Sequence, residues 1–133
     1  MAHNPKLSVA RRNAMLDTGF DVLNGGYLDI YDGTQPATTE TAVSTQVKLA
    51  RLALNATFGA AASSATKTAN AISSGTALAT GTATWGTLVT SGGTRVLDMS
   101  VGTSGADINM DSVAIQQDAT VSCSSCVLTM AAG

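Results

Sequence analysis

Charged side chains are scarce in this sequence. They make up 12% of its 133 residues and leave a formal net charge of −2, whereas roughly 25% is usual in soluble proteins. Because there is no basic excess, the attraction that drives nucleic-acid binding is missing, and we expect no nucleic-acid partner. A surface of Ala, Thr, Ser and Gly loses few hydrated ions when it is covered, so it suits contact with other proteins. The alternative is simply a weakly charged β-domain.

Large apolar side chains are also few. The sequence has one Trp, two Phe and two Tyr within a hydrophobic fraction of 44%, much of it Ala. Ala buries little surface, so we expect a thin core whose stability depends partly on neighbouring molecules. The length fits one domain. No run approaches the ~20 apolar residues of a membrane span, and residues 1–23 lack a signal-peptide core, so we expect no membrane partner and no export by the usual route.

Residues suited to catalysis or metal binding are nearly missing. His3 is the only histidine and Glu40 the only glutamate, so a nucleophile–histidine site or a paired-carboxylate site has little to build on. The segment Asp107-Ile-Asn109-Met-Asp111 matches the opening of a calcium loop but lacks the Gly and the closing Glu that should follow. We therefore expect no enzyme, no cofactor and no metal site.

The two cysteines form a C-x-x-C pair, Cys123 and Cys126. Val121 before them and Val127 after them predict a strand, not the helix N-terminus of a redox motif. Residues three apart on a regular strand point to opposite faces, so these thiols would not meet unless a bulge lies between them. Two interpretations stay open. Both thiols are free, or they are candidates for an intersubunit disulfide in an assembled particle.

Residues 8–24 predict one helix. Ser8 is a suitable N-cap, and the pair Gly25-Gly26 is a suitable stop. Between them, apolar residues recur at roughly helical spacing. The three that we interpret as candidate contacts with a partner protein are Leu16, Phe20 and Leu23.

The charges of this helix suit an isolated helix poorly. Arg11 and Arg12 lie near the positive end of its dipole, and Asp17 and Asp21 repel each other across one turn. The helix should therefore need packing from outside itself. We expect that deleting residues 1–24 abolishes partner binding and leaves the β-domain folded.

Alternation of apolar and polar residues predicts strands in the rest of the chain. Turn signals about every 8–12 residues are typical of an antiparallel sandwich or barrel. We expect a mainly β fold, an antiparallel β-sandwich of jelly-roll or immunoglobulin-like type, preceded by one N-terminal helix. Residues 1–25 would form the arm and helix and residues 26–133 the sandwich, in a single domain overall. The predicted strand segments are 27–31, 47–56, a hairpin over 81–101, 107–115 and 121–130.

Three segments together carry a resemblance to a known family. They are Gly26-Tyr-Leu-Asp-Ile-Tyr-Asp-Gly-Thr-Gln-Pro-Ala37, Gly81-Thr-Ala-Thr-Trp85 and Val101-Gly-Thr-Ser-Gly-Ala-Asp-Ile-Asn109. The chain resembles, from about Leu7 to Met130, a family of small tailed-phage and prophage virion structural proteins similar to capsid decoration (cement) proteins. Two features depart from that family: Gly86 stands where a bulky residue is usual, and the cysteine pair is not part of its pattern.

The resemblance implies a structural role in the virion. The protein would bind and stabilise the shell of the major capsid protein, or else serve as a tail, neck or fibre-base component. Its partners would be the major capsid protein or other virion proteins, it would act as a homo-oligomer, and it would be assembled in the host cytoplasm. Gly86 would leave space for the side chain of a neighbouring subunit.

Overall fold

Helix α1 (Val9–Gly19) begins where the sequence predicts it to begin. In the computed structural model, which describes residues 4–130, Ser8 Oγ accepts a hydrogen bond from the Arg11 amide at 3.2 Å. A short 3-10 helix, η1 (Asp21–Leu23), follows, and Gly25 then adopts a φ of 69° that favours glycine. The predicted helix is confirmed, although its last turn has 3-10 geometry.

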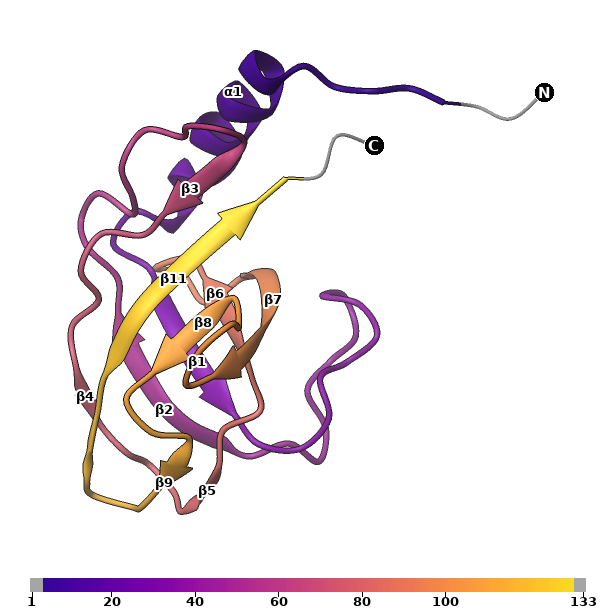
Figure 1. Ribbon diagram of the computed structural model, residues 1–133. Helices are drawn as coiled ribbons and strands as arrows, with labels where there is room; N and C mark the ends of the chain where they lie inside the picture. Colours follow the sequence, from indigo (N-terminus) through magenta and orange to yellow (C-terminus); the bar gives the residue numbers. More distant parts are fainter. Residues whose placement is uncertain (1–3, 131–133) are drawn as a thin grey trace.

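One curled sheet of seven strands forms the body of the molecule, in the order β2-β1-β6-β7-β8-β11-β3 (Figure 1). Neighbouring strands are antiparallel except β7 and β8, which are parallel. Its strands are β1 (Tyr27–Tyr31), β2 (Lys48–Ala53), β3 (Thr66–Thr68), β6 (Trp85–Val89), β7 (Arg95–Gly102), β8 (Ile108–Met110) and β11 (Cys123–Thr129). Two short pairs join β4 (Gly75–Thr76) to β10 (Thr120–Val121) and β5 (Gly81–Thr82) to β9 (Ala114–Ile115).

The mainly β fold with one N-terminal helix is confirmed, but a sandwich is not. Seven of the strands form one mixed sheet instead of a purely antiparallel arrangement. The difference arises in the loop between β7 and β8, which does not simply reverse the direction of the chain. Gly105 takes a φ of 70° there, and the loop makes a full circuit that places Val101 beside Ile108 in parallel register.

Local strand patterns are confirmed where they were clearest. In β1, Leu28 and Ile30 both lie in the core, as their alternation predicts. Segment 47–56, which also allowed a helix, contains β2. The hairpin of β6 and β7 turns over residues 90–94, where the Thr90 amide donates to the Thr94 carbonyl at 2.9 Å.

Polar contacts hold α1 against its own chain. Asn13 Oδ1 accepts a hydrogen bond from the Ala65 amide, and Asp17 Oδ1 accepts one from the Ala62 amide, both at 2.8 Å. The buried ammonium of Lys67 donates to Asp17 at 2.9 Å. This hydrogen bond holds the pKa of the Asp17 carboxyl below its usual value. The packing that the helix needs is therefore supplied within the chain.

The helical region also shares the core of the sheet. Leu16 is 2% exposed and Leu23 is 0% exposed, and both belong to one apolar cluster with β1, β2 and β6. Removal of residues 1–24 would uncover that cluster, which argues against a β-domain that stays folded without them. The helical region therefore packs against the sheet as part of the same core.

We predict that Leu23→Ala lowers the free energy of unfolding by about 2–5 kcal/mol, since it leaves a cavity in the shared core. The neighbouring Val22 is 54% exposed, and Val22→Ala should change it by about 0.5 kcal/mol or less. Urea unfolding of both variants measures the difference. Equal, small effects would mean that η1 does not belong to the cooperative core.

Candidate functional site

The three predicted contact residues of the helix do not form an outer surface. Leu16 and Leu23 point into the chain's own core, and Phe20 is half-buried at the wall of a cavity. Both leucines are therefore buried within the fold, and the contact of the helix with a partner protein stays a prediction. The exposed large apolar side chains of this region include Met15 of α1 and Val22 of η1.

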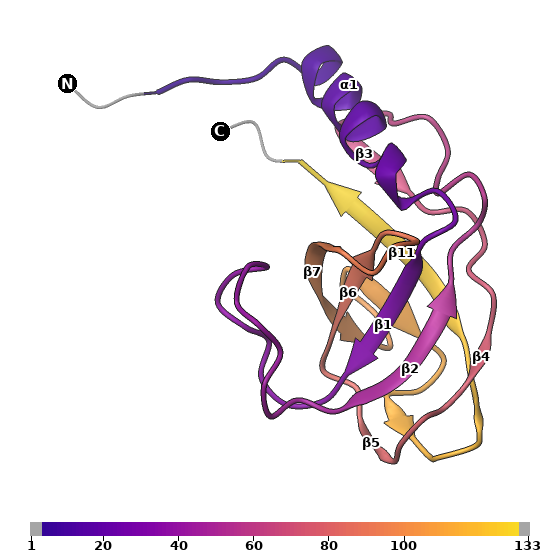
Figure 2. The same cartoon turned by 180° about the vertical axis from the view of Figure 1, so that it is seen from behind.

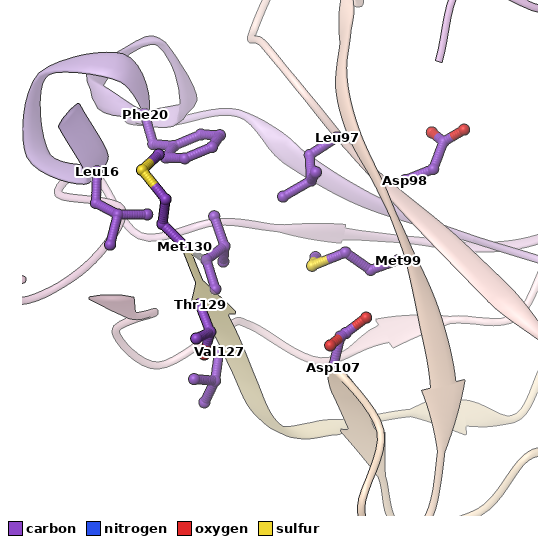
Figure 3. Close-up of a pocket in the computed structure, with 10 residues that line it drawn as sticks. Leu16, Phe20, Leu97, Asp98, Met99, Asp107, Val127, Thr129 and Met130 are labelled. Atoms are coloured by element: carbon purple, nitrogen blue, oxygen red, sulfur yellow. The ribbon is translucent and has the colours of Figure 1, made fainter. Parts of the chain in front are cut away.

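The cavity opens where the sheet splits between β7 and β11 (Figure 3). β8 pairs with β7 only at Val101 and Gly102, and it pairs with β11 only between Cys123 and Cys126. Beyond these pairs, no strand in residues 4–130 lies between β7 and β11. The resulting space, about 350 Å³, is called the β7–β11 slot below. Its lining residues are Leu16, Phe20, Leu97, Asp98, Met99, Asp107, Val127, Leu128, Thr129 and Met130.

The slot is apolar on one side and acidic on the other. Leu97 and Met99 extend toward Met130, whereas Asp98 points away from them (Figure 3). Asp98 pairs with Arg95 through Oδ2 at 2.5 Å, but its buried Oδ1 has no hydrogen-bond partner. A buried carboxylate oxygen without a donor is costly. Because Asp98 points away from Leu97 and Met99, this oxygen lies on the opposite face of β7 from the apolar lining of the slot.

The segment that resembles a calcium loop is used for structure. The Asp107 carboxylate accepts hydrogen bonds from the Ser100 amide and hydroxyl at 3.4 and 3.2 Å. Asn109 Oδ1 accepts from the Ala106 amide at 3.1 Å, and its Nδ2 donates to Ser125 Oγ at 3.0 Å. Within residues 4–130, no three His, Cys, Asp or Glu side chains gather closely enough to hold a metal ion.

A bulge in β11 places the two cysteines on one face. Cys123 lies opposite Met110 and Cys126 lies opposite Ile108, with the register shift between Cys123 and Ser125. Both thiols are free. Burial raises the pKa of Cys126 to about 12 and also raises the pKa of the half-buried Cys123. Cys126 cannot reach another subunit, so the intersubunit disulfide stays a prediction for Cys123 alone.

Sequence reasoning missed a group of charged and aromatic side chains on the outer face of β1. Asp29, on the face predicted to be polar, is only 2% exposed. Arg51 donates two hydrogen bonds to its carboxylate at 2.7 and 2.9 Å, and Lys48 lies 3.3 Å away. The hydrogen bonds to Asp29 raise the pKa of Arg51. Alternation along the strand places Tyr27, Asp29 and Tyr31 on one face of β1. It does not predict that Asp29 on this face is buried.

Aromatic stacking completes this group. The rings of Tyr31 and Trp85 are stacked with centroids 4.7 Å apart, and the Arg95 guanidinium lies 5.7 Å from the Trp85 ring. Burial raises the pKa of the Tyr31 hydroxyl. The ion pairs and ring contacts of this group join residues of β1, β2, β6 and β7, so we interpret the group as one that holds these four strands together.

Gly86 leaves no space for a neighbouring subunit. A Cβ at this position would lie 3.1 Å from Ile108 Cδ1 and 3.3 Å from Ile30 Cδ1. The room that a bulky residue would fill is therefore taken by this chain's own isoleucines.

Comparisons with known proteins add no relative to this description. No protein-family model, curated protein or solved structure matches the chain. Among the described residues, no helix is both long enough and apolar enough to cross a membrane.

We predict that Cys123 is the only thiol of the native protein to react with a disulfide reagent near pH 8, because Cys126 is buried and protonated there. Cys123→Ser should abolish the reaction and any covalent dimer on a non-reducing gel, whereas Cys126→Ser should leave both unchanged. A native Cys123→Ser protein that still reacts rapidly would contradict this assignment.

Proposed function

We propose that this protein is a structural component of a tailed-phage virion, acting as a capsid decoration protein that binds and stabilises the shell of the major capsid protein. The observation that carries the proposal is the distribution of exposed apolar side chains on an exterior with few charges. Four of the six large apolar side chains exposed in residues 4–130 belong to the N-terminal region. They are Leu7, Val9, Met15 and Val22.

The charges of the sheet favour this role further. Lys48, Arg51, Lys67 and Arg95 all pair with carboxylates of the same chain. These pairs lower the net charge that a partner would have to desolvate on the sheet, and only 12% of the residues of the chain are charged. Each contact would be weak, but many copies bound to one shell would together stabilise the shell through multivalency.

The outer edges of the sheet offer a partner few free backbone groups. The Ser73 and Leu78 amides donate to the carbonyls of Ala53 and Leu49 in β2 at 3.0 and 2.7 Å. At the other edge, the Ala60 amide donates to the Thr68 carbonyl of β3 at 3.2 Å. Because the chain covers these edges itself, we place the shell contact on the outer face of α1 and on η1.

We predict that the purified chain binds tailed-phage capsids that lack it, in proportion to the number of capsid subunits. Met15→Asp and Val22→Asp should each weaken binding about tenfold or more, since a charge would then be buried in the contact. Co-sedimentation with the capsids measures the bound fraction, and thermal unfolding checks that each variant is folded.

The matched control is Leu78→Asp. Leu78 is 56% exposed and lies between β4 and β5, at the end of the molecule opposite to α1 (Figure 1). This variant should bind normally. Binding in proportion to tails and not to shells would instead support a tail, neck or fibre-base component. No binding to either would overturn the virion role.

A further inference from the structure

The β11 side of the β7–β11 slot presents unpaired backbone groups. The Val127 amide points to this side, because it donates to the Asp107 carbonyl at 3.1 Å. Alternation along an antiparallel strand places the N–H and C=O of Thr129 on the same edge. β3 lies along the opposite edge, where the Met130 amide donates to the Ala65 carbonyl at 2.9 Å. Within residues 4–130, no strand pairs with Thr129 on the slot side.

The β7 side presents a second unpaired edge. The Val101 amide donates to the Thr84 carbonyl at 3.3 Å, which fixes the side of β7 that faces β6. By the same alternation, the N–H and C=O of Asp98 point into the slot, and β8 begins its pairing only at Val101. Two strand edges with unpaired backbone groups therefore border the slot, one on each side.

The N-terminal arm has the properties of a strand that could pair with such an edge. Residues 4–8 extend away from the rest of the molecule in both views and are exposed (Figures 1 and 2). Ser8 has the extended φ and ψ of −66° and 158°. Pro5 and Leu7 alternate with Lys6 and Ser8, so one face of the arm is apolar and the other is polar. At ~3.3 Å per residue, this arm is long enough to run along the unpaired part of β7.

The charges of the arm and the slot are complementary. The residues that line the slot include Asp98 and Asp107 and no Lys or Arg, although Arg95 already pairs with one oxygen of Asp98. Residues 1–8 contain Lys6 and no Asp or Glu. A strand added beside β7 would place Leu7 on the face of Leu97 and Met99. Its neighbour Lys6 would then lie on the face of Asp98, whose Oδ1 has no hydrogen-bond partner.

We propose that the β7–β11 slot binds the N-terminal arm, residues 4–8, of a second copy of this chain by β-strand addition. The arm of the same copy starts at the far end of α1 and leads away from the slot, whose helical wall is formed by Leu16 and Phe20 near the other end (Figures 1 and 2). Backbone hydrogen bonds supply affinity, and the pocket for Leu7 supplies specificity. The inference does not rest on a role in the virion.

We predict that the full chain self-associates and that Leu7→Asp weakens the self-association about tenfold or more, because Leu7 is 40% exposed in one copy and would be buried in the slot of the next. Leu78→Asp is the matched control: it adds the same charge at another exposed apolar position outside the slot, and it should self-associate normally. Sedimentation equilibrium over a range of concentrations measures both.

Hydrogen exchange at Thr129 gives a second readout. Its amide should exchange slowly in the self-associated wild type and fast in Leu7→Asp. A synthetic peptide of residues 1–9 should restore slow exchange in that variant, and the same peptide with Leu7→Asp should not. A wild type that stays monomeric with fast exchange at Thr129 would overturn the proposal. The proposal would also be overturned if the wild type stayed monomeric at every concentration and its Thr129 amide still exchanged slowly. That result would mean that the arm fills the slot of its own copy.

Discussion

The shape of this molecule depends on the position of Asp107 between two strands. Its carboxylate accepts hydrogen bonds from Ser100 of β7, and its carbonyl accepts one from the Val127 amide of β11. This residue ties the two strands together at the start of β8, which is only three residues long. Beyond that point nothing in residues 4–130 spans the gap, so β7 and β11 diverge. The split sheet, the cavity and the two unpaired edges all follow from this single junction.

Ion pairs within the chain fix where the strands and the helix meet. Arg51 and Lys48 neutralise Asp29, Lys67 neutralises Asp17, and the Arg95–Asp98 pair lies beside Trp85. Each pair has at least one partner that is almost completely buried: Asp29, Lys67 or Asp98. Such pairs add little net stability, but a buried charge that lost its partner would be costly, so each pair holds its two segments in one arrangement.

Local features were predictable from the sequence and long-range ones were not. The Ser8 cap, the alternation of β1 and the β6–β7 hairpin depend on neighbours within a few residues, and all three are confirmed. The glycines of the loop between β7 and β8 indicated a turn, but glycine permits several directions, and the parallel return depends on Asp107. Likewise, helical periodicity does not reveal the polar contacts of Asn13 and Asp17 with a loop about fifty residues away along the chain. The helix was therefore predicted to be free to contact a partner, although it packs within its own chain. The slot could not be predicted because its lining comes from segments far apart in the sequence: the helical region, β7, Asp107 and β11.

The covering of the outer sheet edges has a consequence for behaviour at high concentration. Exposed edge strands let sheets of different molecules join without limit and form fibrils or amorphous aggregates. Here the chain's own segment around Gly75 lies so close to β2 that a Cβ on this glycine would be 3.0 Å from the Arg51 carbonyl oxygen. A side chain there would have to move the protecting segment away from β2. Glycine at position 75 thus lets this segment cover the edge closely, which guards against uncontrolled polymerisation.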